Sequence, residues 1–300
     1  MEARSPTHRE GATKSLSLSR ILWATDFSPS SLASLPYAVA IARRYQSSIY
    51  LAHVIVPHPY PLVSPEAAPY VEGLNKAALK RLSELSSSGQ FAGIPSQTLL
   101  GHGEVAEGLN GLARDHEIDL IVVGTHGRRG LRRFFWGSVS EEIWRTSACP
   151  VLTVGPHVTK EPDLEIALRQ ILYPTDLSEE SFSAARHAVS FALEYASHLT
   201  VLHVVPSAIR ASTKLLVRAF RDEVRAIIFA EAEPWCEPEC VVESGDPAET
   251  ILKVAKERQA DLIVLGVRSP QALATQRVGN VAYRVVTEAD CPVLTVRAGA

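Results

Sequence analysis

The sequence predicts an α/β fold of two tandem, doubly wound, Rossmann-like domains, each built on a five-stranded parallel sheet. The first observation behind this prediction is that the sequence contains an internal repeat, so that motifs of its first half recur in its second half. Ile21-Leu-Trp-Ala-Thr-Asp26 returns as Ile171-Leu-Tyr-Pro-Thr-Asp176, and Cys149-Pro-Val-Leu-Thr-Val154 returns as Cys291-Pro-Val-Leu-Thr-Val296. The second is that short Val, Ile and Leu runs alternate with longer helix-like stretches in each copy. Such βαβ order builds parallel sheets with right-handed crossovers.

The apolar runs place the expected strands. They fall at 20–25, 48–54, 97–101, 119–124 and 150–154 in the first copy, and at 169–174, 199–205, 239–243, 261–266 and 292–296 in the second. Helices of the first copy are expected at about 29–46, 66–88, 104–117 and 138–147. Ser28-Pro29 and Asp246-Pro247 each put a capping side chain before a proline, and Ser138-Val-Ser-Glu141 fits a capping box. These patterns mark helix starts.

Length and composition bound the class of protein. Three hundred residues with 46% hydrophobic content fit two ordinary globular domains. We expect a disordered lead-in at 1–19, a first domain at 20–155, a linker at 156–168 and a second domain at 169–297. The net charge of −3 argues against a nucleic-acid-coating protein, and no apolar run approaches the ~18 residues of a membrane span. Without a hydrophobic signal segment or a disulfide framework, the expected location is cytoplasmic.

A glycine-rich loop follows the fourth expected strand of the first copy. It reads Gly124-Thr-His-Gly127, then nine residues, then Gly137-Ser138 at the start of a helix. Glycines let backbone N–H groups approach an anion closely, and a helix N-terminus adds unpaired donors and partial positive charge. The pattern predicts a phosphate cradle. Four arginines add positive charge there: Arg128, Arg129, Arg132 and Arg133.

Together with other motifs, this loop resembles the universal stress protein family. The other motifs are Asp26 after the first strand, the His53-Val54 pair that ends the second, and the closing Cys-Pro-Val of each copy. The resemblance covers residues of about 18–155 and 168–297. It implies an adenine nucleotide α-hydrolase-like fold, with ATP held at the carboxyl ends of the strands, where doubly wound sheets bind ligands. It also implies a role in stress response or signalling without dedicated catalysis.

The resemblance implies a set of site residues by motif. Ala24, Thr25 and Asp26 would face the ribose and adenine, and Val54 would pack on the adenine. Gly124, Gly127, Gly137, Ser138, Val139 and Ser140 would surround the ribose and phosphates, with His126 and Arg128 as further loop contacts. ATP is the expected cofactor, and whether Mg²⁺ accompanies it stays open. No catalytic residue and no protein-held metal are expected.

The second copy departs from the loop motif. Ser269-Pro270 stands where the first copy has Gly127-Arg128, and Asn280 stands in place of Ser138. Proline lacks an N–H group and biases the preceding residue towards extended conformations. Asn280 still suits a helix start. We therefore expect the nucleotide to be held mainly by the first domain.

Some of these residues have purely structural interpretations. Asp26 and Asp176 can each cap the turn after a first strand. His53 and His203 are expected to be satisfied structural histidines. The loop arginines can instead contact an acidic partner or remain solvated.

Two other functions stay open. One is an interaction or scaffold module without nucleotide, which the second copy resembles; the other is slow ATP hydrolysis. By resemblance, the two domains are expected to pair within the chain through their last strands, with further homodimerisation open and no nucleic acid or membrane partner.

Overall fold

A computed structural model of the chain describes residues 16–56, 67–125, 138–159, 166–208, 214–228, 238–267 and 280–298. It confirms the predicted α/β class. We call residues 20–155 the first repeat and residues 169–297 the second repeat. The strands of the first repeat are β1 Arg20–Ala24, β2 Ser48–Ile55, β3 Ser96–His102, β4 Leu120–Gly124 and β5 Val151–Val154. Those of the second are β6 Gln170–Pro174, β7 His198–Val205, β8 Glu239–Ser244, β9 Leu262–Val267 and β10 Val293–Arg297.

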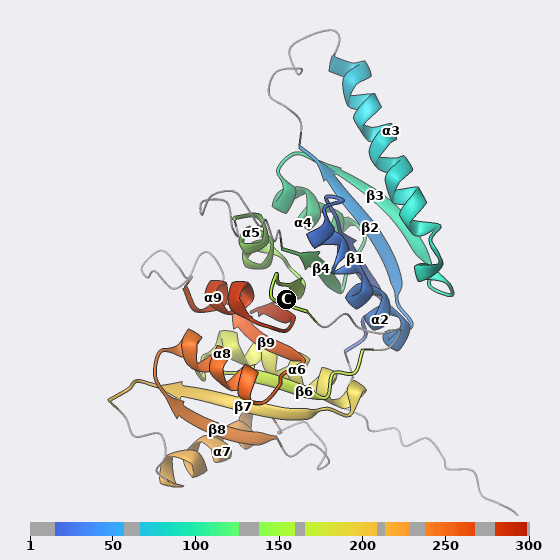
Figure 1. Cartoon of the computed structure of the whole chain (residues 1–300). Coiled ribbons are helices and arrows are strands. Elements are labelled where there is room, and N and C mark those ends of the chain that lie inside the picture. The colour runs from blue at the N-terminus through green and yellow to red at the C-terminus, as the bar shows by residue number, and fades with distance from the viewer. Residues whose placement is uncertain are drawn as a thin grey trace, which may run out of the picture.

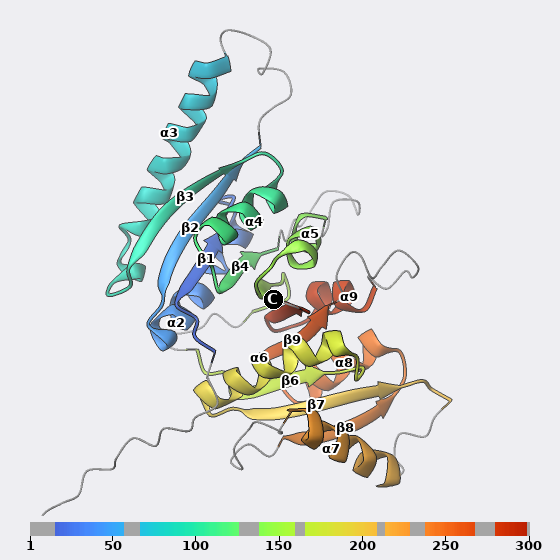
Figure 2. The same cartoon turned by 180° about the vertical axis from the view of Figure 1, so that it is seen from behind.

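The strands form one continuous sheet across both repeats (Figures 1 and 2). Its order is β3-β2-β1-β4-β5-β10-β9-β6-β7-β8, so each repeat contributes a parallel half. The halves meet where β5 runs antiparallel to β10, with Leu152 opposite Leu294. Within each half, the chain reverses its winding direction beside the first strand, between β1 and β4 and between β6 and β9. These are the switch points at which doubly wound sheets bind ligands.

Helices cover both faces of the sheet, as the alternating pattern predicts (Figure 1). The first repeat carries α1 Pro29–Leu32, α2 Leu35–Tyr45, α3 Ala67–Ser86, α4 Val105–Asp115 and α5 Ser138–Thr146, with a 3₁₀ turn at Gly89–Phe91. The second carries α6 Glu179–Tyr195, α7 Lys214–Ile228, α8 Pro247–Glu257 and α9 Asn280–Glu288. Of the helices that the structure describes, none has the length and hydropathy that a bilayer span requires.

The single helix expected at 29–46 was wrong, because the structure divides it into α1 and α2. Pro36 is the second residue of α2 and has no N–H group for the carbonyl of Leu32, and its ring crowds that carbonyl. The second repeat has Arg186 at the matching position, and there α6 runs without a break. One residue difference therefore explains the shape of this segment.

The predicted caps at two helix starts are confirmed. The Ser28 side chain accepts a hydrogen bond from the Ser31 N–H at the start of α1. The Asp246 side chain accepts one from the Glu249 N–H at the start of α8. A third helix, α5, begins at Ser138 as the sequence predicts.

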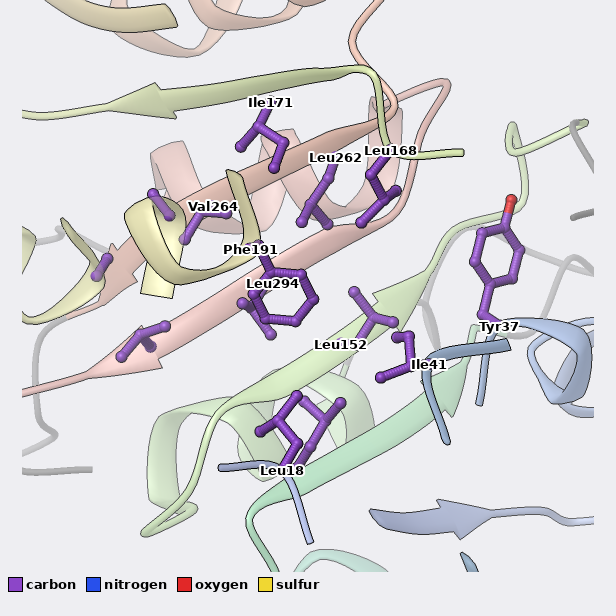
Figure 3. Close-up of a cluster of buried hydrophobic side chains, with 14 of the residues drawn as sticks. Leu18, Tyr37, Ile41, Leu152, Leu168, Ile171, Phe191, Leu262, Val264 and Leu294 are labelled. Atoms are coloured by element: carbon purple, nitrogen blue, oxygen red, sulfur yellow. The ribbon is translucent and has the colours of Figure 1, made fainter. Parts of the chain in front are cut away.

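One hydrophobic core runs through both repeats (Figure 3). It lies on the sheet face covered by α2 and α6, where Ile41 and Leu152 of the first repeat lie near Phe191 and Leu294 of the second. The opposite face has separate clusters, one under α4 and α5 and one under α8 and α9. Because the shared core crosses the β5–β10 joint, the two halves of the sheet pack as one unit.

Candidate functional site

The turn between β1 and α1 is held by short side chains that bond to the backbone. Thr25 lies at the end of β1, and its N–H donates to the Ala52 carbonyl of β2 at 2.9 Å. Its Oγ1 accepts from the Phe27 N–H at 2.9 Å, and the Asp26 Oδ1 accepts from the Ser28 N–H at 3.0 Å. Phe27 has a φ of 63°, a left-handed conformation that these bonds stabilise.

The same turn occurs in the second repeat. Thr175 Oγ1 accepts from the Leu177 N–H at 3.0 Å, Asp176 Oδ1 accepts from the Ser178 N–H at 3.1 Å, and Leu177 has a φ of 63°. The turn-capping role of Asp26 and Asp176 is therefore confirmed. Contact between Asp26 and a ligand stays a prediction, which the exposure of its side chain at the end of β1 permits.

Val54 is the last residue but one of β2 and packs against two glycines. A Cβ atom on Gly108 of α4 would lie 2.9 Å from Val54 Cγ1, and one on Gly101 of β3 would lie 3.1 Å from Cγ2. A Cβ atom on Gly108 would therefore force Val54 or α4 to shift, and one on Gly101 would make a tight contact that Val54 could relieve only by moving a few tenths of an ångström. The sequence analysis missed both glycines. A comparison of the two repeats could have indicated them, because the second repeat has Glu243 and Thr250 at the positions of Gly101 and Gly108.

His53 is a structural histidine, as expected. Its Nδ1 lies 2.7 Å from the Thr25 carbonyl oxygen and donates to it. The ring centre lies 4.7 Å from that of Phe27, and the Arg81 guanidinium lies 4.1 Å from the Phe27 ring centre. His203 repeats the hydrogen bond, to the Thr175 carbonyl at 2.9 Å. These contacts stabilise the strand ends.

Gly124 has a packing role besides the predicted phosphate role. A Cβ atom there would lie 2.2 Å from the Ser30 carbonyl oxygen, so only glycine lets α1 lie against the end of β4. His126, Gly127, Arg128 and Gly137 lie outside the described residues. The backbone of Ser138, Val139 and Ser140 forms the first turn of α5.

The strand order brings the described residues together at one edge. β1 lies between β2 and β4, with Ala24 paired to Ala52 on one side and to Val123 on the other. The chain segments that carry Asp26, Val54 and Gly124 therefore leave the sheet next to one another. This geometry can accept a ligand across the switch point between β1 and β4. Which atoms the ligand touches stays a prediction.

The second repeat has a cavity of about 220 Å³ at the matching edge. It opens between the ends of β6, β7 and β9 and the starts of α8 and α9. The first repeat also contributes, because Trp144 and Arg145 of α5 line the cavity. Sequence reasoning did not predict a contact from the first repeat.

Metal and redox chemistry find no support in the described part of the chain. It holds no cluster of three or more His, Cys, Asp or Glu placed for a metal ion. Cys149 and Cys240 are free thiols, and burial raises the pKa of both. The described thiols are therefore small packed residues. The predicted C-x3-C pair includes Cys236, which lies outside the described residues.

Comparison with known proteins places the fold in a family. A sequence model of the Universal stress protein family matches residues 18–155 and 167–297. A universal stress protein of Mycolicibacterium smegmatis is 27% identical over 293 residues, which is 92% of this chain and 96% of that protein. One from Methanocaldococcus jannaschii is 31% identical over 139 residues, which is 43% of this chain and 82% of that protein.

A solved structure agrees on the fold. The crystal structure of a universal stress protein from Archaeoglobus fulgidus superposes with a TM-score of 0.75 at 20% identity, covering 95% of this chain and all of that one. With two family matches that together span most of its length, the chain belongs to the universal stress protein family, in its tandem two-domain form.

Proposed function

We propose that the protein is an ATP-binding member of its family that acts in stress response or signalling, with the nucleotide held by the first repeat and without dedicated catalysis. The observation that carries the proposal is that the loop leaves the sheet beside the β1 turn and ends at the N-terminus of a helix. Gly124 ends β4 beside β1, and the loop returns to the backbone of α5 at Ser138. A polyphosphate between them would face the helix N-terminus, where unpaired N–H groups favour anions.

The second repeat serves as a partner in this proposal. Its loop carries Ser269-Pro270 and Asn280 in place of the glycine and serine of the motif. We infer that the antiparallel contact of β5 with β10 is the intramolecular form of the edge-to-edge pairing that the resemblance implies. Without this contact, β5 and β10 would each be an edge strand with one neighbour in its own half, β4 and β9 respectively. The contact therefore covers one edge of each half-sheet.

The test is calorimetric titration of the nucleotide-stripped full chain with ATP and Mg²⁺. We expect one site per chain. Gly127→Ser with Ser138→Asn copies the second repeat's residues into the first. It should lower ATP affinity by about tenfold or more, because a Cβ at position 127 keeps the backbone N–H groups from approaching the phosphates closely and the Ser138 hydroxyl is lost. Unchanged affinity would show that the site is assigned wrongly.

The matched control changes the second repeat instead. Ser269→Gly, Pro270→Arg and Asn280→Ser restore the first repeat's residues, and should raise the stoichiometry towards two if the loop alone was lost. A wild-type stoichiometry of two would show that the second repeat binds ATP already. Release of phosphate, followed over hours with the same preparation, separates binding from slow hydrolysis.

A further inference from the structure

A row of basic side chains runs along one face of α7. Its members follow one another at intervals of four, three and four residues, which places them on the same side of a helix. All of them are exposed, and we call them the basic row: Lys214, Arg218, Arg221 and Arg225. At a helical rise of about 1.5 Å per residue, the basic row is about 16 Å long.

The basic row lies on the side of α7 that borders β8. The ring of Phe220, on another side of the helix, stacks on the ring of His203 in β7, with ring centres 5.3 Å apart. Arg221 and Arg225 instead lie near the Cys240 thiol of β8, where they oppose the rise that burial causes in its pKa. Figures 1 and 2 show α7 alongside β8.

The strand beside the basic row is an edge strand. β8 is the last strand in the sheet order, and in the part of the chain that the structure describes it pairs with β7 alone. The N–H and C=O groups on the outer side of such a strand can pair with an added strand. The basic row therefore runs along a sheet edge that is open to a partner.

The basic row is specific to the second repeat, although the first repeat has the same kind of edge. There β3 is the last strand of the sheet, and α3 packs on it (Figure 1). The buried residues of the two helices correspond at an offset of 142 residues, Ala78 with Phe220 and Leu82 with Val224. At this offset, the positions of the basic row hold Glu72, Lys76, Leu79 and Ser83. Basic residues that only protected a sheet edge from aggregation would be expected on both helices.

The two faces of β8 differ in charge. Side chains alternate between the faces of a strand, so Cys240 points towards α7 and Glu239 and Glu243 point to the opposite face. The Glu239 carboxylate already accepts from Arg258 at 2.7 Å. Acidic residues of an added strand are therefore favoured on the α7 side and repelled on the other side.

The spacing of the basic row suits the period of a strand. Alternate residues of a strand are ~6.7 Å apart, and neighbours in the basic row are about 6, 4.5 and 6 Å apart along the helix. A strand with an acidic residue at every second position can thus bring three carboxylates to the basic row. The residues between them would face Glu239 and Glu243.

We propose that the β8 edge and the basic row form a docking surface for an extended protein segment that carries acidic residues at alternate positions, and that this segment joins the sheet as a further strand beside β8. Backbone pairing would supply affinity, and the carboxylates would supply specificity. An anionic membrane fits this surface less well, because Asp222 and Glu223 are exposed on α7 and would meet its headgroups. The surface does not depend on ATP binding by the first repeat.

The test uses a fluorescent peptide of about seven residues in which glutamate alternates with threonine, with both ends blocked. Fluorescence anisotropy with the full chain should give a Kd of about 100 μM or tighter at low salt. An increase in ionic strength from about 0.05 to 0.5 M should weaken binding about tenfold, since the carboxylates act through charge. No binding at millimolar protein would overturn the proposal.

Two control peptides separate strand addition from simple attraction of charge. One has the same composition with its glutamates consecutive, so that it presents carboxylates on both faces, and should bind about tenfold more weakly. The other is the alternating peptide with every backbone nitrogen methylated, which removes the donors for strand pairing and should also bind about tenfold more weakly. Equal affinity of all three peptides would refute strand addition.

Variants locate the surface. Arg218→Glu with Arg221→Glu reverses two charges in the middle of the basic row and should weaken the alternating peptide about tenfold or more. Lys76→Glu, at the position of Arg218 in the first repeat, is the matched control and should leave the affinity unchanged. Circular dichroism checks folding. If the double variant does not fold, Arg218→Gln removes one exposed charge and should still weaken binding about threefold.

Two outcomes would contradict the assignment. Peptide affinity that is unchanged in the folded double variant and in Arg218→Gln would place the peptide elsewhere. Vesicles of phosphatidylserine and phosphatidylcholine test the membrane alternative. Vesicle binding that the double variant loses, together with no binding of the alternating peptide, would assign the basic row to a membrane surface and overturn the proposal.

Discussion

Arg44 and Glu194 occupy equivalent positions in the two repeats, 150 residues apart, and form an ion pair with each other. The Arg44 Nε lies 2.7 Å from the Glu194 Oε1, and the guanidinium also donates to the Glu194 carbonyl oxygen. Their neighbours Tyr45 and Tyr195 are likewise equivalent, with ring centres 6.4 Å apart. In a pair of identical domains, two arginines or two glutamates would meet here. The repeats have thus become complementary and are not interchangeable.

Reversal of one charge at this joint should destabilise the protein. Arg44→Glu or Glu194→Arg places like charges together and should lower the free energy of unfolding by about 0.5–1 kcal/mol, a modest value because the two side chains are 51% and 33% exposed. The double swap should recover part of the loss, since the guanidinium contacts to the Glu194 carbonyl and the Tyr195 ring are not recreated. Urea unfolding of all four proteins measures the coupling. Additive single effects would show that the pair contributes nothing.

Two glycines of α4 should respond in opposite ways to alanine. Gly111→Ala adds a Cβ where nothing lies within 4 Å, so it should stabilise the protein by about 0.5–1 kcal/mol through helix propensity. Gly108→Ala gains the same propensity but pushes on both Val54 methyls, and should end about 1–3 kcal/mol below Gly111→Ala. Thermal unfolding compares the pair. Equal midpoints would mean that Val54 moves aside without cost.

His187 should make stability fall in mild acid. Burial lowers the pKa of this histidine below its usual value near 6.5, so the unfolded chain binds its proton more readily than the folded one does. Its contribution is fully present above the unfolded pKa and is lost as the pH falls below about 6.5, by at most ~1.4 kcal/mol per pH unit. Tyr37 stands at the matching position of the first repeat, so His187→Tyr is the natural control. Urea unfolding between about pH 5.5 and 7.5 should show a shallower pH slope for the variant.

Asp26 and Asp176 should separate turn capping from ligand contact. Asp26→Ala and Asp176→Ala each remove a hydrogen bond to a backbone N–H, so both should cost about 1 kcal/mol of stability. Under the proposed function, only Asp26→Ala should also lower ATP affinity, by about tenfold. Calorimetry with ATP on both variants provides the comparison. An equal and small effect on ATP would leave Asp26 with its turn role alone.

The fold was predictable because independent features of the sequence indicate the same architecture. Strands buried on both faces, capped helix starts and the internal repeat all indicate one architecture. The prediction failed at 29–46, where a proline at the second position of a helix was not recognised as a break. Pro36 acts through the Leu32 carbonyl, a contact that only the folded turn reveals.

The placement of the predicted site residues at one edge of the sheet could be read from the sequence, but the packing around them could not. Motif spacing indicated the edge at which Asp26, Val54 and Gly124 lie, and the strand order explains why they meet there. The roles of Gly101 and Gly108 depend on how closely α4 approaches β2, which sequence does not specify. The placement of Trp144 beside the second repeat depends on the joint between the two halves of the sheet.

Because β5 and β10 belong to one polypeptide, dilution does not separate the two halves of the sheet. A tethered partner is present at a constant effective concentration, set by the connecting segment and not by expression level. The part of the cavity wall that α5 provides is therefore present in every folded chain, whatever the concentration of the protein.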